Sequence, residues 1–205
     1  MISIVDYGLG NILAFTNIYK KLNIAAKVVS TQEQLQTAEK IILPGVGSFD
    51  WAMTRLNDSG MRDTLDYLVL EEKVPTLGIC VGMQMMANKS DEGELVGLGW
   101  INAEVKKFDE TKFTQTTHLP HMGWNDVTPV KSCCLFSQIE INARFYFLHS
   151  YYFAHMRQEQ ILAQTDYNGL FTSSASYENI YGVQFHPEKS HHWGIQLLKN
   201  FAEIC

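Results

Sequence analysis

A short apolar segment that ends in Gly78-Ile-Cys80-Val-Gly82 constrains the fold of this chain more than any other feature. Residues 76–79 have the pattern of a buried strand, and residues 83–87 have that of a helix. The two glycines let the strand and the helix approach closely, while the cysteine takes a strained backbone angle that points its sulfur outward. This arrangement is a nucleophile elbow, and it predicts that Cys80 is a nucleophile at the carboxyl end of a strand.

A second motif, Gly182-Val-Gln-Phe-His186-Pro-Glu188, places a histidine at the end of another apolar strand. Thiol, imidazole and carboxylate together form a nucleophilic triad, in which the base removes the thiol proton and the acid fixes the tautomer of the base. Each part alone has a plain structural interpretation, since Cys80 could be a small core residue and Glu188 a solvated loop charge. The combination of elbow glycines, two strands and His-x-Glu favours the catalytic interpretation.

Composition limits the class of protein. The 205 residues, 46% of them hydrophobic, suffice for one buried core, and no shift in composition divides them, so we expect a single domain over residues 1–205. A formal net charge of -6 without a basic stripe argues against a nucleic-acid partner.

No apolar run reaches the roughly 20 residues of a membrane span, and the first residues lack a signal-peptide pattern, which predicts a cytoplasmic protein. Four cysteines, two of them adjacent at Cys133 and Cys134, do not suggest a disulfide framework and fit a reducing compartment.

The first half of the chain alternates short apolar runs with amphipathic segments. The expected strands and helices alternate in the order 2–5, 12–22, 27–29, 31–38, 41–43, 61–70, 76–79 and 83–87. Such alternation predicts an α/β fold with a mostly parallel central sheet flanked by helices, and ligand sites at the carboxyl ends of the strands. The second half changes to short strand-like runs, which favours an antiparallel section; these runs are 103–107, 145–149, 161–165 and 171–176. The chain finishes with an expected strand at 180–185 and a helix at 192–204.

Attack on an amide carbonyl creates an oxyanion, which needs two hydrogen-bond donors. In elbow folds one donor is the backbone N–H of the residue after the nucleophile, here Val81, and the other comes from a neighbouring strand-to-loop turn. The turn Pro44-Gly-Val-Gly47 is the candidate for the second donor, although it could be an ordinary turn. Gln84 lies one helical turn after Cys80, so its amide faces the same pocket unless it points to solvent.

Two other motifs do not predict a cofactor. Asp6-Tyr-Gly-Leu-Gly-Asn11 resembles a phosphate-binding loop but lacks the third glycine and the lysine of stronger fingerprints, so we do not expect a nucleotide. His186, His191 and His192 are not joined by cysteines or carboxylates at metal-ligand spacing, so we do not expect a metal.

Six motifs span almost the whole chain: Asp6-Tyr-Gly-x-Gly-Asn11, Leu43-Pro-Gly-Val-Gly-Ser48, Leu77-Gly-Ile-Cys-x-Gly-Met-Gln84, Leu119-Pro-His-Met-Gly-Trp-Asn125, His149-Ser-Tyr-Tyr152 and Phe185-His-Pro-Glu-Lys-Ser190. In content and order they resemble the triad-type (class I) glutamine amidotransferases. Within that family they are most similar to the glutaminase subunits of imidazole glycerol phosphate synthase.

The resemblance implies hydrolysis of L-glutamine to glutamate and ammonia. Cys80 would attack the side-chain amide to form a γ-glutamyl thioester, His186 would protonate the departing ammonia and then activate water, and Glu188 would orient His186. Val46 and Val81 would supply the oxyanion donors. The residues implied in glutamine binding are Gly47, Gln84, Ser150 and Tyr151.

The same resemblance implies a heterodimer in histidine biosynthesis. Ammonia would pass through a protein tunnel to a (β/α)8 cyclase subunit that forms imidazole glycerol phosphate and AICAR. The positions that match the family's subunit interface are Asn11, Trp124, Tyr146 and Lys189. Because ammonia is protonated in bulk water, hydrolysis should be coupled to the partner. We expect the flanking glycines to let the peptide Gly45-Val46-Gly47 turn an N–H inward when the partner binds its ligand.

Two segments, residues 11–15 and 190–194, depart from the pattern expected of the histidine-pathway subunit, and both border the expected interface. One alternative is therefore a paralogue that supplies ammonia to a cyclase-like synthase with another acceptor, such as a sugar of a surface polysaccharide. A free-standing cysteine hydrolase or peptidase would not require Gln84 or Lys189. A noncatalytic binding subunit would not require an intact triad.

Overall fold

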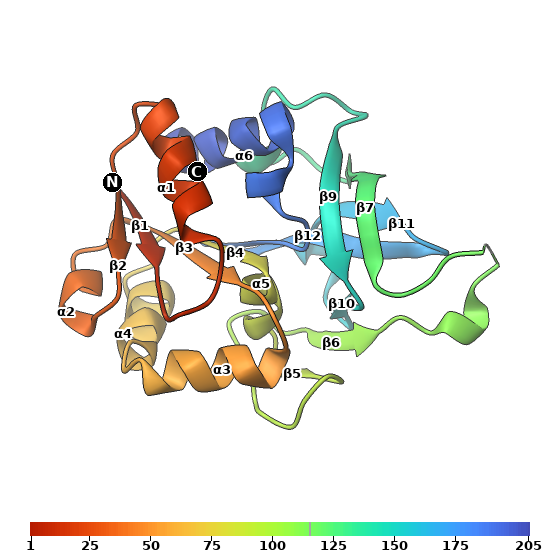
Figure 1. Ribbon diagram of the computed structural model, residues 1–205, viewed down its shortest axis with the longest axis horizontal. Coiled ribbons are helices and arrows are strands. Elements are labelled where there is room, and N and C mark those ends of the chain that lie inside the picture. Colours follow the sequence, from red (N-terminus) through yellow and green to blue (C-terminus); the bar gives the residue numbers. More distant parts are fainter. Residues whose placement is uncertain (115) are drawn as a thin grey trace.

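A central sheet organises the fold, and the computed structural model describes it over residues 1–114 and 116–205 (Figure 1). Within those residues the sheet has 11 strands, and its main path runs β2-β1-β3-β4-β13-β12-β10-β6-β5. The strands on the β2 side are parallel, those beyond β13 are mainly antiparallel, and β13 joins the two halves. Cys80 and the histidine motif leave neighbouring strands at this junction.

The parallel half consists of β1 (Ile2–Val5), β2 (Ala26–Val29), β3 (Lys40–Gly45), β4 (Thr76–Cys80) and β13 (Ile180–Val183). In Figure 1, α1 (Ile12–Lys21) and α6 (His191–Glu203) cover one face of it. The opposite face carries α3 (Phe49–Asp58), α4 (Arg62–Asp66) and α5 (Val81–Met85). A short α2 (Gln32–Leu35) follows β2. Because both faces are covered, all residues of β1 and β4 are buried, as is usual in parallel sheets.

The antiparallel half extends the same sheet. It contains β6 (Glu104–Lys107), β10 (Tyr151–Ala154), β11 (Ile161–Asp166) and β12 (Leu170–Tyr177), with the two-residue strands β5 (Lys89–Ser90) and β8 (Thr128–Pro129). A separate antiparallel pair, β7 (His121–Asp126) and β9 (Arg144–His149), stands beside it in Figure 1. The predicted change from parallel to antiparallel pairing is therefore confirmed.

Apart from the two-residue strands β5 and β8 and the short 3-10 turns, three elements were not predicted from the sequence. Helix α3 buries Phe49, Ala52, Met53 and Leu56 at helical spacing, but the polar residues between them obscured the pattern. Strand β7 was not predicted because its burial does not alternate regularly and Gly123 takes a φ of +126°. Strand β10 follows β9 after one residue, so the two appeared as one run in the sequence. The helix expected at 61–70 divides into α4 and a π-helical turn, Tyr67–Glu71.

The prediction about the cysteines is wrong for two of them. Cys134 and Cys205 form a disulfide across 71 residues, with their Cα atoms 5.5 Å apart. The pairing arises because a 3-10 turn, Cys134–Phe136, lies beside the last turn of α6, where Asn200 donates hydrogen bonds to the carbonyls of Leu135 and Ser137. Cys80 and Cys133 are free.

Within residues 1–114 and 116–205, every helix falls short of the length and hydropathy needed to cross a membrane.

Two buried histidines join β7 to β9. His121 and His149 are paired across the strands, and the Nδ1 of His121 lies 3.0 Å from the Nε2 of His149. His149 donates its own Nδ1–H to the carbonyl of Tyr151, so its Nε2 accepts from His121. His121 also stacks between the rings of Phe147 and Tyr167. Burial lowers the pKa of His121 to about 4 and that of His149 to about 3.

This histidine pair should make the fold sensitive to acid. Both pKa values lie below the ordinary 6.5, so the unfolded chain takes up protons first, and stability present above pH 6.5 is lost as the pH falls towards 4. Replacing His121 with Gln should remove about 2 kcal/mol of the acid-induced loss at pH ~4.5. Urea unfolding of wild type and His121→Gln at neutral and acid pH measures the difference.

The matched control is His192→Gln, because His192 is exposed. It should lose as much stability on acidification as the wild type. An equal loss in His121→Gln would mean that other groups dominate acid unfolding.

Candidate active site

Cys80 has the backbone geometry that the elbow requires. Its φ is +55° and its ψ is -114°, and α5 begins at the next residue. The helix lies so close to the sheet that a Cβ on Gly82 would collide with the carbonyl oxygen of Leu43. A Cβ on Gly78 would meet the backbone of Gly82. The predicted strain at the cysteine and the close approach at both glycines are confirmed.

His186 and Glu188 are held together behind the cysteine. The Nδ1 of His186 lies 2.9 Å from Oε1 of Glu188, and the two side chains are only 4% and 2% exposed. Burial by itself would lower the pKa of His186, but hydrogen bonds to Cys80 and Glu188, together with the charges of both, outweigh it and raise this pKa. Because Nδ1 faces Glu188, the other ring nitrogen is the one available to the sulfur. The site therefore favours the protonated, imidazolium form of His186 beside the sulfur.

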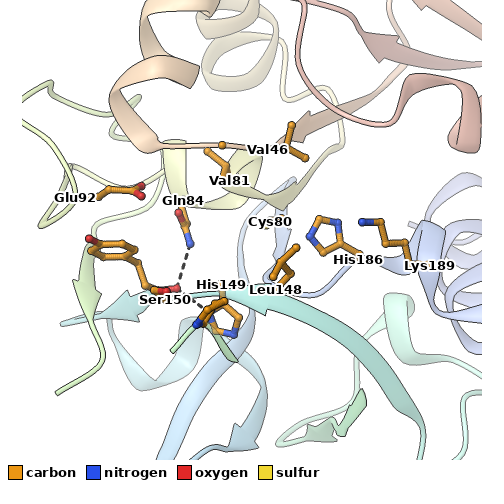
Figure 2. Close-up of a pocket in the computed structure, with 13 residues that line it drawn as sticks. Val46, Cys80, Val81, Gln84, Glu92, Leu148, His149, Ser150, His186 and Lys189 are labelled. Carbon is orange, nitrogen blue, oxygen red and sulfur yellow. Dashed lines mark hydrogen bonds between the residues drawn. The ribbon is translucent and has the colours of Figure 1, made fainter. Parts of the chain in front are cut away.

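A cavity of about 280 Å³ opens over Cys80. Figure 2 shows Glu92 and Gln84 on one side of the cysteine and His186 and Lys189 on the other. The predicted site residues that line this cavity are Cys80, His186, Val46, Val81, Gly47, Gln84, Ser150, Tyr151 and Lys189. A single hollow thus receives residues from the loop after β3, from β4, α5 and β10, and from the turn after β13.

The remaining predicted residues lie outside the cavity. Glu188 is behind His186, and Asn11 is an exposed residue that precedes α1. Trp124 and Tyr146 are cross-strand neighbours on β7 and β9, with their rings 6.2 Å apart. The ammonium group of Lys189 lies 5.7 Å from the centre of the Tyr146 ring, so three of the four expected interface residues form one surface.

The loop expected to supply an oxyanion donor follows β3. Gly45 pairs with Cys80 in the parallel register of β3 and β4, and Gly47 has a φ of +87°, where a Cβ would make only an ordinary contact with the side chain of Trp51. Gly45 differs from the expectation, because a Cβ there would collide with the backbone of Gly82. Glycine is therefore required at 45 for packing, and Gly47 alone provides conformational freedom.

The hydroxyl of Tyr7 fixes the start of this loop. It donates a 2.7 Å hydrogen bond to the carbonyl of Pro44, and burial raises the pKa of Tyr7 well above its ordinary value. The N-terminal motif around Tyr7, which resembled a phosphate loop in sequence, thus supports the turn beside the nucleophile. Nothing in the sequence linked Tyr7 to Pro44, because the two are 37 residues apart.

Gln84 uses its amide nitrogen within the protein. Its Nε2 lies 3.1 Å from the carbonyl of Tyr151 and 3.0 Å from Oε1 of Gln184. Both hydrogens of the amide are therefore engaged, and the oxygen is the part of Gln84 that remains for a ligand.

Glu92 is a cavity residue that the sequence analysis missed. Its Oε2 accepts a 2.8 Å hydrogen bond from the backbone N–H of Phe49, and burial raises the pKa of its carboxyl. In the sequence it lies in the acidic run Asp91-Glu-Gly-Glu94, which looks like an ordinary solvated loop. Only the packing of this loop against α3 brings Glu92 to the cavity.

Comparison with known proteins agrees with this geometry. Residues 3–205 match the family model for the glutamine amidotransferase class-I domain. The chain is 57% identical over its full length to the whole imidazole glycerol phosphate synthase subunit HisH of Bdellovibrio bacteriovorus. It is 48% identical, over 99% of both chains, to the subunit named HisH 2 of Methanococcus maripaludis.

A solved structure described as a glutamine amidotransferase shares the fold, with a TM-score of 0.76 at 19% identity, over 98% of this chain and 97% of that one. The family match and the full-length identity to HisH proteins lead to one conclusion. The chain belongs to the class-I glutamine amidotransferase family and, within it, to the HisH group.

Proposed function

We propose that this chain hydrolyses L-glutamine to glutamate and ammonia, with Cys80, His186 and Glu188 as its catalytic triad. The observation that carries the proposal is the strained Cys80, which lines one cavity with an imidazole whose pKa is raised and which Glu188 orients. This geometry places a nucleophile, its base and the group that orients the base in one site.

In the acylation step the thiolate of Cys80 attacks the side-chain amide carbon, and the oxyanion forms at the carbonyl oxygen. Backbone N–H groups of Val81 and Val46 are the proposed donors to it, since both residues line the cavity next to the sulfur. The imidazolium of His186 gives its proton to the departing ammonia, and a γ-glutamyl thioester remains. His186, now neutral, takes a proton from water, whose oxygen attacks the thioester and releases glutamate.

The two ends of the cavity suit the two ends of glutamine. Glu92 offers a negative charge to the α-ammonium group, and Gln84 offers an acceptor oxygen. Gly47, Ser150 and Tyr151 complete the proposed binding surface around the side chain.

The proposed partner is a (β/α)8 cyclase subunit, as in the imidazole glycerol phosphate synthase named for the relatives. Trp124, Tyr146 and Lys189 form a surface beside the cavity, and Asn11 completes the proposed interface. In this proposal ammonia passes to the cyclase without meeting bulk water, and the complex works in the cytoplasm.

A second candidate acceptor has one observation in its favour. His191, in the segment that departs from the expected pattern, stacks on Trp124 with the rings 5.0 Å apart and nearly parallel. The partner surface thus carries a group that a different cyclase-like synthase could recognise.

Glutamate release from glutamine tests the proposal, measured for the chain alone and with the histidine-pathway cyclase and its ribonucleotide ligand. We expect strong stimulation by that mixture and a loss of about a thousandfold or more in Cys80→Ala, because the nucleophile is removed. Cys133→Ala is the matched control, since Cys133 is also free. Basal activity that the cyclase does not stimulate would favour the second acceptor, and an active Cys80→Ala would refute the triad.

The raised pKa of His186 sets the alkaline limit of activity. The imidazolium that protonates ammonia is present below the raised pKa and is lost as the pH rises through it. Glu188→Gln removes one of the negative charges that raise this pKa, so the alkaline limb of kcat should move down by about one pH unit.

Glu178→Gln is the control for this shift, because Glu178 is an exposed surface partner of Lys73. It should leave the alkaline limb in place. A lower kcat with an unmoved limb in Glu188→Gln would show that Glu188 acts through orientation alone.

Gly47 should matter for coupling to the partner more than for folding. The Cβ of a valine there meets no steric clash, but the residue must adopt a φ of +87°, so the loop loses its freedom to turn an N–H inward. Gly60→Val is a matched control, since Gly60 has a φ of +71°, a Cβ there meets no clash either, and it does not line the cavity. Both variants should lose about 1–2 kcal/mol of stability, but only Gly47→Val should lose ligand-stimulated glutaminase activity. Unchanged stimulation in Gly47→Val would refute a moving loop.

A further inference from the structure

Gln184 lies against the nucleophile, although the sequence analysis gave it no role. It is fully buried, and it follows β13 two residues before His186. Its Nε2 is 3.8 Å from the Sγ of Cys80, a hydrogen-bond distance for sulfur. The backbone N–H of Gln184 donates a 2.9 Å hydrogen bond to the carbonyl of Ser173, which fixes the backbone that carries the side chain.

A backbone carbonyl decides which end of the Gln184 amide faces the sulfur. The carbonyl of Tyr151 can only accept, so Gln84 must direct its amide nitrogen towards it. That same nitrogen lies 3.0 Å from Gln184, which must therefore present its oxygen to Gln84. The NH2 group of Gln184 is left to face Cys80. His149 also donates to the Tyr151 carbonyl, so this acceptor is itself fixed.

An N–H donor directed at the sulfur has a clear chemical consequence. Cys80 is only 4% exposed, so water contributes little to stabilising a negative charge there. A buried thiolate is favoured by donors, and a hydrogen bond to a charged group is stronger than one between neutral groups. His186 supplies the positive charge beside the sulfur, while Gln184 supplies a neutral donor that does not change during the reaction.

We propose that Gln184 is a catalytic residue that donates a hydrogen bond to the Cys80 thiolate. In the proposed reaction the thiol proton passes to His186, and Gln184 stabilises the charge left on sulfur. When sulfur bonds to the γ-carbon the charge leaves it and this hydrogen bond weakens. When water displaces the thioester, the thiolate forms again and the hydrogen bond is restored. The proposal rests on the proposed role of Cys80 as nucleophile.

Gln184→Met tests this role, because methionine is similar in size and cannot donate. The readout is the rate at which iodoacetamide alkylates Cys80, followed by mass spectrometry of the peptide that contains it, as a function of pH. The midpoint of this profile should move up by about one pH unit, so the rate below the midpoint should fall about tenfold. The limiting rate at high pH should stay the same, and kcat for glutamine should fall more than KM rises.

A merely structural role gives a different result. If Gln184 only supports Gln84, KM for glutamine rises and the alkylation midpoint stays in place, which would overturn the proposal. Gln160→Met is the matched control, because Gln160 is also buried and does not line the cavity. An equal midpoint shift in that control would also overturn it.

A second measurement does not require Gln184→Met to fold. In wild-type protein labelled with 15N-glutamine, the side-chain NH2 signals of Gln184 should shift with pH at the alkylation midpoint, and Cys80→Ala should remove that shift. NH2 signals of Gln184 that do not shift at the alkylation midpoint, or that shift equally in Cys80→Ala, would refute the hydrogen bond. Wild-type glutaminase activity is measured in parallel, with the cyclase and its ribonucleotide ligand present. Its absence would refute the proposed function, whereas an active enzyme with an unmoved midpoint would refute only the role of Gln184.

Discussion

The contact between α5 and the sheet at Gly82 is the constraint on which the site depends. Because the helix backbone lies against the carbonyl of Leu43, the chain must turn sharply between β4 and α5, and Cys80 occupies that turn with a positive φ. The same contact sets the position of the loop after β3, since Gly45 pairs with Cys80 and packs on Gly82. One close approach therefore places the proposed nucleophile and the candidate oxyanion loop side by side.

The histidines of this protein show how surroundings decide the chemistry of one side chain. His121 and His149 are buried among aromatic rings and neutral partners, so their pKa values fall. His186 is also buried, but two acidic groups hydrogen-bond to it and its pKa rises. The first pair holds β7 on β9 in neutral form, while the third can carry a proton to a leaving group.

Hydrogen bonds join the surface proposed for the partner to His186, the proposed catalytic base. The carbonyl of Tyr146 accepts a 2.8 Å hydrogen bond from the backbone N–H of His186. The backbone N–H of Tyr146 donates a 3.0 Å hydrogen bond to Ser190 Oγ. Ser190 in turn donates to the carbonyl of His186. A displacement of β9 at this surface would therefore move the backbone of His186 directly, because these hydrogen bonds connect the two.

The sequence by itself determined the local parts of this protein. The alternation of apolar runs gave the parallel half of the sheet, and the glycines around Cys80 gave the elbow, because both are short-range patterns that backbone sterics and burial enforce. The family motifs further identified candidate residues that lie together in one cavity. Tertiary structure alone decided which distant groups meet. Tyr7 and Pro44, Glu92 and Phe49, Gln184 and Cys80, and the cysteines 134 and 205 come together through packing of separate elements. No local pattern encodes these contacts, because each depends on how strands and helices far apart in the chain are placed against one another.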